Sequence, residues 1–408
     1  GSASGIWTLD QAADYEQRGL WPKPLVQREL YTWGFNSNGQ LGQGNTTDRS
    51  SPVQVGSLTN WLTIAAGSYH TLTIKQDGTL WSWGQNNDGQ LGLGDTSNRS
   101  SPVQVGALTT WLDVVGGYSH SMAIKTDGTL WAWGDNGNGR LGDGTAVAKR
   151  SSPVQIGALT NWAKLPKNLE KQSFAITTDG NLYAWGWNYY GQLGLGDTTN
   201  RSSPVQVGSG YWQSVSGSDQ SSTGVTTGGK LYTWGNNNFG QLGQGNTTSY
   251  SSPVQVGALT TWSVSATGEG ESMSAIKTDG TLWGWGNNGT GQLGDGSTTG
   301  RSSPVQIGSL TTWSNVNTGD TFCAAIKTDG TIWAWGRNDK GPVGQGNTTN
   351  YSSPVQVGAL TTWSVSATGN GESMSAIKTD GTLWSWGNNL TGQLGDGSTT
   401  GRSSPVQI

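Results

Sequence analysis

Residues 72–105 read LTIKQDGTLWSWGQNNDGQLGLGDTSNRSSPVQV. On both sides of Asp77 and Gly78, apolar residues alternate with polar ones, which is the period of a half-buried strand. Asp-Gly between two such runs indicates a type I′ hairpin turn, because both central residues of that turn need positive φ. A Gly/Asn-rich loop then leads to a last strand at Pro102, and proline suits an edge strand. The stretch therefore predicts short antiparallel strands.

The same pattern recurs along the chain. The motif [WY]-x-W-G occurs eight times at intervals of about 50 residues, each time followed by a Gly-rich loop and by SSPVQ. Its second tryptophan is Trp33, Trp83, Trp133, Trp185, Trp234, Trp285, Trp335 and Trp386. Four short strands per repeat, with no helical pattern between them, predict an all-β propeller with four antiparallel strands per blade.

The order of motifs [LI][WY]-x-WG-x-N-x-x-GQLG-x-G, SSPVQ, G-x-x-H and [AT]IK-x-DG-T resembles the repeat of the RCC1 family over residues 30–408. The resemblance implies a seven-bladed propeller, usually closed by strands from both chain ends. Residues 1–29 do not match the repeat, and we expect a short helix there over residues 11–18. The pattern GIW-T-L…WP in this segment resembles a stretch of tailed-phage virion proteins.

The count of half-repeats leaves the closure of the ring open. Eight WG/SSP halves accompany seven [AT]IK halves, because the chain starts with an outer half, residues 30–60, and ends with another. The first half could complete the blade begun by residues 363–378. Alternatively, residues 363–408 could form an intact last blade and leave the first half spare, or the ring could have eight blades, one without inner strands. A spare half would expose strand edges, so we hypothesise self-association through it.

The composition argues against several classes of function. The net charge is −4 and no basic run exists, which argues against nucleic acid as a partner. No apolar stretch reaches the 18 residues of a transmembrane helix, so we expect no membrane contact. The single cysteine, Cys323, excludes an internal disulfide framework, and its surroundings predict a buried strand. Residues 262–307 and 363–408 are nearly identical, which indicates recently amplified repeats.

Candidate catalytic residues are few. His70 and His120 occupy equivalent places in the first two repeats, and the family resemblance implies that this histidine hydrogen-bonds between blades. No third ligand recurs at metal spacing, and no Ser/His/Asp arrangement can be built. We therefore predict a non-enzymatic protein with no metal and no cofactor. Glu269, Glu271 and Glu372 precede inner strands, where we expect solvated turn residues rather than an acidic rim.

The candidate binding residues are those that break the repeat. The loop after WG varies while its framework is constant, and exposed aromatic side chains there suggest stacking on sugars or burial against protein. The segment before one inner strand also departs from the glycine-rich pattern of the other repeats. The predicted site comprises Trp187, Tyr189, Tyr190, Phe35, Phe239, Lys167, Glu170 and Lys171.

These observations support several hypotheses of function. The first is a propeller of a phage-like virion or surface protein that binds a host glycan or protein through variable loops, on the virion or the extracellular surface. The alternatives are an RCC1-type regulator resembling a guanine nucleotide exchange factor, and an inhibitor-type propeller that binds another protein with one face. Fold alone does not distinguish them.

Overall fold

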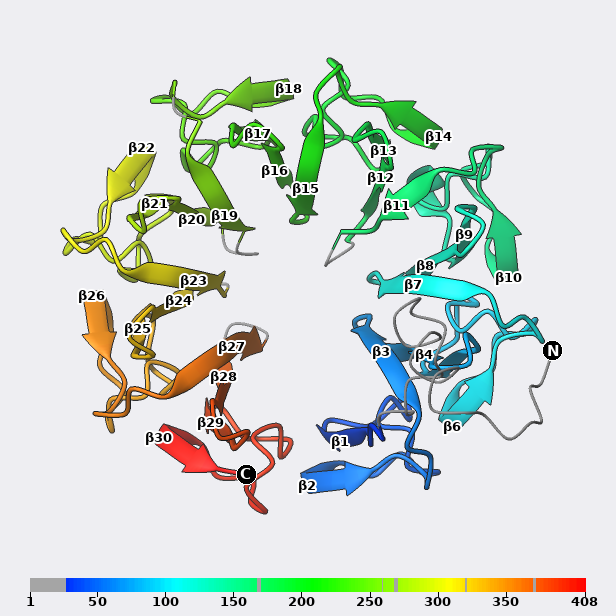
Figure 1. The fold of residues 1–408 in the computed structure, drawn as a ribbon, viewed down its shortest axis with the longest axis horizontal. Helices are drawn as coiled ribbons and strands as arrows, with labels where there is room; N and C mark the ends of the chain where they lie inside the picture. The colour runs from blue at the N-terminus through cyan, green and yellow to red at the C-terminus, as the bar shows by residue number, and fades with distance from the viewer. Residues whose placement is uncertain (1–26, 167–169, 259, 268–270, 320, 370–371) are drawn as a thin grey trace, which may run out of the picture.

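The strands are arranged as a ring of radial sheets around a central opening (Figure 1). The structure is a computed structural model that describes residues 27–408 except 167–169, 259, 268–270, 320 and 370–371. Within these ranges the strands form seven four-stranded antiparallel sheets, called blades 1 to 7, and one two-stranded sheet, called the half-blade. No helix in the described ranges is long and apolar enough to cross a membrane.

The half-blade and the first three blades follow one another along the chain. The half-blade contains β1 (Tyr31–Gly34) and β2 (Arg49–Gln54). Blade 1 contains β3 (Trp61–Ala66), β4 (His70–Lys75), β5 (Leu80–Gly84) and β6 (Arg99–Gln104). Blade 2 contains β7 (Trp111–Gly116), β8 (His120–Lys125), β9 (Leu130–Gly134), the 3-10 turn η1 (Gly137–Gly139) and β10 (Arg150–Gln155). Blade 3 contains β11 (Trp162–Lys164), β12 (Gln172–Thr177), β13 (Leu182–Gly186) and β14 (Arg201–Gln206).

The last four blades have the same strand order. Blade 4 contains β15 (Trp212–Gly217), β16 (Ser221–Thr226), β17 (Leu231–Gly235) and β18 (Tyr250–Gln255). Blade 5 contains β19 (Trp262–Thr267), β20 (Ser272–Lys277), β21 (Leu282–Gly286) and β22 (Arg301–Gln306). Blade 6 contains β23 (Trp313–Thr318), β24 (Phe322–Lys327), β25 (Ile332–Gly336) and β26 (Tyr351–Gln356). Blade 7 contains β27 (Trp363–Gly369), β28 (Ser373–Lys378), β29 (Leu383–Gly387) and β30 (Arg402–Gln407).

The hairpin between the second and third strands forms where the sequence predicts it, but its turn is not of type I′, because Gly78 has a positive φ and Asp77 does not. In blade 1 the backbone N–H of Gly78 donates to the carbonyl of Lys75 at 2.9 Å, and Gly78 has a φ of +77°. The Asp77 carboxylate accepts hydrogen bonds from the backbone N–H and the hydroxyl of Thr79. The turn sets the register of β4 on β5, in which Thr73 lies opposite Trp81. Short local sequence therefore determines each inner hairpin.

The second tryptophan of each WxWG motif joins one repeat to the preceding one. Its indole N–H donates to a backbone carbonyl of the preceding G-[QR]-LG loop, at 2.7 to 3.0 Å. In the repeat that reads GPVG, Pro342 still accepts the bond from Trp386, because only a carbonyl oxygen is required. Around these indoles, apolar residues from adjacent blades form buried clusters, one at each junction between complete blades. These tryptophans therefore pack between neighbouring blades.

The half-blade closes the ring between blades 7 and 1. The Trp33 indole donates to the Gln393 carbonyl of blade 7 at 3.0 Å, and on the other side the Trp83 indole of blade 1 donates to the Gln40 carbonyl. Blade 7 is itself a complete four-stranded sheet, so residues 30–60 do not complete it. The seven blades expected from the sequence are confirmed, and the surplus half-repeat occupies an additional position in the ring. The expected N-terminal helix over residues 11–18 and the phage-like segment lie outside the described residues.

Cys323 lies in β24, as its sequence context predicts. Its side chain is fully buried, and burial raises the pKa of the thiol to about 12. The reactive form of cysteine is the thiolate, so this thiol is inert at neutral pH.

Candidate functional site

The two variable loops of each repeat lie on the same rim of the ring. In an antiparallel sheet of consecutive strands, the first and third strands run in one direction, so the loops that follow them share one side. The backbone N–H of Trp187, after the third strand of blade 3, donates to the carbonyl of Lys171, before the second strand. We call this side of the ring the variable rim. The structure thus places the two variable loops of blade 3 side by side.

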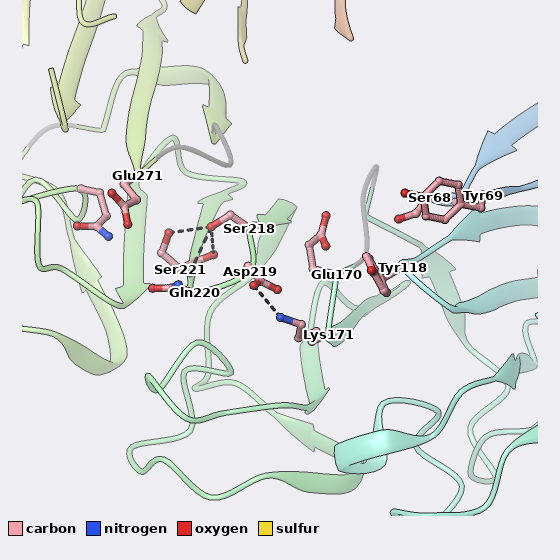
Figure 2. Close-up of a pocket in the computed structure, with 12 residues that line it drawn as sticks. Ser68, Tyr69, Tyr118, Glu170, Lys171, Ser218, Asp219, Gln220, Ser221 and Glu271 are labelled. Carbon is pink, nitrogen blue, oxygen red and sulfur yellow. Dashed lines mark hydrogen bonds and ion pairs between the residues drawn. The ribbon is translucent and has the colours of Figure 1, made fainter. Parts of the chain in front are cut away.

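A polar cavity of about 860 Å³ opens on the variable rim. Its walls come from the loops between the first and second strands of blades 1 to 5, with one residue from the loop after β17 (Figure 2). The lining residues are Gly67, Ser68, Tyr69, Tyr118, Glu170, Lys171, Ser218, Asp219, Gln220, Ser221, Gln241 and Glu271. The cavity thus combines two tyrosines with one lysine and three carboxylates.

Lys171 connects the loops of two neighbouring blades. Its ammonium group forms an ion pair with the Asp219 carboxylate of blade 4, drawn as a dashed line in Figure 2. The two groups lie 2.8 Å apart, and the ammonium group lies 5.0 Å from the ring centre of Trp187. Both charged side chains are partly exposed, so the ion pair itself contributes little to stability. Its effect is positional, because it holds the segment before β12 of blade 3, which lacks the usual glycines, against the corresponding loop of blade 4.

The three aromatic residues of the blade 3 loop form one cluster. The rings of Trp187 and Tyr189 are nearly parallel, with an interplanar angle of 11°, and Tyr190 packs edge-on against both. Trp187 and Tyr190 are half-buried, whereas Tyr189 is 67 % exposed. The loop aromatics therefore pack on each other and leave the Tyr189 side chain largely exposed to solvent.

The other predicted residues lie on the same rim, apart from this cluster. Phe35 of the half-blade packs edge-on against Tyr69, a residue of the cavity wall, at 6.4 Å between ring centres. Phe239 lies exposed in the loop after β17 of blade 4. Lys167 lies outside the described residues. The structure therefore brings Glu170 and Lys171 into the cavity and places the aromatic residues at its border.

Sequence reasoning did not single out several residues of the cavity wall. Tyr69 and Tyr118 lie beside the histidines in the segments AGSYH and GGYSH, which differ from the other repeats. Comparison of these segments alone could have identified them. Glu271, expected to be a solvated turn residue, lines the cavity with a φ of +69°.

The histidines lie inside the ring wall and not in the cavity. His70 Nε2 lies 2.9 Å from the Ser121 hydroxyl of blade 2, and that hydroxyl donates its only proton to the Gln90 carbonyl. His70 therefore donates its Nε2–H to this hydroxyl. Burial lowers the pKa of His70 to about 4 and also lowers that of His120, which makes the equivalent contact with Ser173. The histidines thus join blades, as the family resemblance implies.

No metal-binding arrangement appears in the described part of the chain, where no three His, Cys, Asp or Glu side chains gather in a suitable group. The carboxylates of the variable rim are instead held by neighbouring side chains. Asp219 pairs with Lys171, and the Glu372 carboxylate accepts a hydrogen bond from the Asn388 amide at 2.6 Å. The chemistry of the cavity is that of polar recognition.

These features define a class: a repeat-built propeller that presents a polar, aromatic-bordered cavity on one rim. The Regulator of chromosome condensation (RCC1) repeat matches residues 29–74, 77–124, 127–165, 179–225, 228–273, 279–326, 329–375 and 380–408. The chain therefore belongs to the RCC1 repeat family.

Similar proteins include both curated relatives and solved structures. The ultraviolet-B receptor UVR8 of Arabidopsis thaliana is 32% identical over 186 residues, which are 45% of this chain and 42% of the receptor. Ras guanine nucleotide exchange factor C of Dictyostelium discoideum is 43% identical over 54 residues, which are 13% of this chain and 4% of that protein. The chain thus spans less than half of either relative.

Two crystal structures share the fold at low identity. Prp20p from Saccharomyces cerevisiae superposes with a TM-score of 0.64 at 19% identity, covering 82% of this chain and 87% of Prp20p. Human WBSCR16 superposes with a TM-score of 0.61 at 21% identity, covering 93% of each chain. At this level of identity the likeness supports the architecture only.

Proposed function

We propose that this chain is an RCC1-type regulatory propeller that binds a protein partner through the cavity of the variable rim. The observation that carries the proposal is the cavity itself, which collects the irregular loops of five successive blades into one concave surface. Binding sites are usually concave and contain a small number of precisely positioned polar groups. The two curated relatives named above are a receptor and an exchange factor, which favours this function over that of a phage-like virion protein.

The charge of the cavity favours a partner with a basic segment. One lysine faces three carboxylates there, and that lysine is already paired with Asp219. The described lining of the cavity therefore carries more acidic than basic side chains. The Prp20p structure is described together with its binding to Gsp1p and histones, and histones supply a basic probe. Nucleotide exchange is not part of the proposal, because the match to the exchange factor covers 4% of that protein.

Binding to purified core histones and to Gsp1p, measured by biolayer interferometry, tests the proposal. We expect histone binding that weakens at least tenfold when Glu170→Lys and Glu271→Lys are combined, since charge reversal opposes a basic partner. Tyr189→Ala should weaken the same complex. Tyr211→Ala is the matched control, because Tyr211 is also 67 % exposed but precedes a first strand and lies on the opposite rim.

Two results would overturn the proposal. One is the absence of binding to both proteins at physiological ionic strength. The other is equal weakening by Tyr189→Ala and Tyr211→Ala, which would show that the variable rim has no special role. Binding on a glycan array without binding to either protein would favour a surface-glycan function instead.

A further inference from the structure

Within the described residues, the half-blade has no counterpart of the inner two strands of a complete blade. In blades 1 to 7 the third strand pairs with the second strand on one side and the fourth on the other. Among the described strands, β1 pairs with β2 alone, so its second edge faces the space that an inner hairpin would occupy. We call this space the inner slot, bounded by β1, by β3 of blade 1 and by β28 of blade 7.

The blade 1 side of the inner slot exposes an apolar residue that other blades cover. Ile64 on β3 is 56 % exposed, whereas the corresponding Val114, Val215 and Val316 are at most 7 % exposed. In those blades the inner strands of the preceding blade pack against the first strand, as β3 and β4 pack on β7. The exposure of Ile64 therefore follows from the hairpin that the half-blade does not have.

The blade 7 side shows the same difference. Ile377 on β28 is 39 % exposed, whereas the corresponding residue of each other blade is at most 3 % exposed: Ile74, Ile124, Ile176, Val225, Ile276 and Ile326. All six residues of the second strand are buried in blades 1 to 6, but only three of six are buried in β28. Both walls of the inner slot are thus built to contact a hairpin.

The floor of the inner slot keeps the form of a complete blade. A cavity of about 400 Å³ runs along β1, β3 and β4, and Tyr31, Trp33, Ile64 and Tyr69 contribute to its lining. Residues 30–34 read LYTWG, the same five residues as 231–235, which include β17 of blade 4. The identity continues in the following loop, where GQLGQGNTT occurs after both. Blade 4 therefore shows which hairpin fits this floor.

We propose that the inner slot binds a β-hairpin of the blade 4 type, which adds two strands to β1. The hairpin is carried by a partner protein and not by a second copy of this chain, whose own blade 4 hairpin already pairs with β17. In blade 4, β16 pairs with β17 so that Ser222 lies opposite Trp234 and Val225 opposite Leu231. The same register on β1 places the equivalents of these two residues opposite Trp33 and Leu30. Addition of strands to an exposed sheet edge is an established mode of peptide recognition.

The last residue of the second strand, which lies near the first aromatic of each motif, further specifies the hairpin. Where that aromatic is tryptophan, the second strand ends in a lysine over the ring, as Lys75 lies 3.5 Å from the ring centre of Trp81. Where it is tyrosine, in blades 3 and 4, threonine replaces the lysine. β1 begins with Tyr31, so the hairpin that fits it ends in threonine, as Thr226 does.

A synthetic peptide with the sequence of residues 212–229 tests the proposal. We expect it to bind the intact chain with one-to-one stoichiometry in isothermal titration calorimetry, and to protect the amides of residues 31–34 from hydrogen exchange. The peptide with aspartate in place of Val225 should bind at least tenfold more weakly, because the charge would enter an apolar contact.

Two protein variants localise the binding. Ile64→Lys should weaken peptide binding at least tenfold, and Leu112→Lys should leave it unchanged. Leu112 is a matched control because it is 53 % exposed on β7, next to a hairpin that is present. Both residues are exposed, so both variants should fold with unchanged circular dichroism.

Three results would overturn the proposal. Failure of the peptide to bind, or equal binding to the Ile64→Lys variant, would show that the inner slot takes no hairpin. A dimer in sedimentation that Ile64→Lys dissociates would show that a second copy of the chain occupies it. Because this site lies apart from Glu170 and Glu271, its failure leaves histone binding at the cavity unaffected.

Discussion

The half-blade and the complete blades share one set of contacts and differ in another. Trp33 keeps the indole-to-carbonyl hydrogen bond of every WxWG motif, yet it is half-buried, whereas the other seven tryptophans are at most 1 % exposed. The outer half of a repeat therefore supplies the directional contacts that join neighbours. The inner hairpin supplies the burial, and burial of apolar surface is the larger contribution to stability.

The largest expected effect on stability comes from removing a WxWG tryptophan, and it distinguishes the contribution of the indole hydrogen bond from that of burial. Trp133→Ala removes a fully buried indole and should lower the free energy of unfolding by ~3–5 kcal/mol. Trp33→Ala removes the same hydrogen bond with less buried surface, so its cost should be about half as large. Guanidinium denaturation followed by circular dichroism measures both. Equal costs would show that the hydrogen bond, and not burial, dominates.

The histidines give the next prediction, because they lie in the second strands that the half-blade lacks. The pKa of His70 is about 4 in the folded chain and about 6.5 when unfolded, so the unfolded chain binds the additional proton between these values. Stability should therefore fall as the pH decreases from 6.5 to 4, by at most about 3 kcal/mol for this residue.

His70→Gln removes this titration while keeping an amide donor, as Gln172 does at the equivalent place in blade 3. The melting temperature of the variant should fall less between pH 6.5 and 4 than that of the unchanged chain. Identical pH profiles would contradict the burial of a neutral histidine.

Glycines at the junctions provide a smaller and more local test. A Cβ on Gly392 would lie 2.5 Å from the Ser50 Cα of the half-blade, and one on Gly89 would lie 2.6 Å from the Ser151 Cα of blade 2. Both glycines also have positive φ. Alanine should cost about 1–3 kcal/mol at each, by overpacking and strain.

The Gly392→Ala and Gly89→Ala variants should destabilise different parts of the ring. Gly392→Ala should detach the half-blade and make the linker before β3 sensitive to protease, while blades 1 to 7 stay protected. Gly89→Ala should lower the melting temperature of the ring instead. Gly106→Ala is the control, since it shares the positive φ but meets nothing within 4 Å. Loss of protection throughout the Gly392→Ala variant would show that the half-blade is required for the whole ring.

Much of the fold could be predicted from the sequence because its determinants are local and repeated. The Asp77–Gly78 turn and the spacing of Trp81 and Trp83 specify the hairpin and the buried face of each repeat. The exposure of Ile64 could not be predicted, because it depends on a neighbour distant in the sequence. Likewise Tyr69 belongs to the cavity through the ring geometry, which brings loops of five blades together.

The smallest expected effect tests whether the last residue of the second strand and the first aromatic of the [WY]-x-W-G motif vary together, as the sequence indicates. Lys327 lies 3.5 Å from the ring centre of Trp333, and burial lowers the pKa of the lysine, so the ring must compensate for lost hydration. Blade 4 has the pair Thr226 and Tyr232 at these places, and the half-blade has Tyr31 with no hairpin opposite among the described strands.

A double-mutant cycle of Lys327→Thr and Trp333→Tyr should give a coupling of about 1 kcal/mol, the size of a partly desolvated cation–π contact. The double variant reproduces the blade 4 pair and should therefore be more stable than the sum of the single changes implies. Additive losses would mean that tyrosine and threonine replace tryptophan and lysine independently. Tyr31 of β1 would then not indicate which hairpin fits the inner slot, and the proposal would rest on the exposure of Ile64 and Ile377 in its two walls.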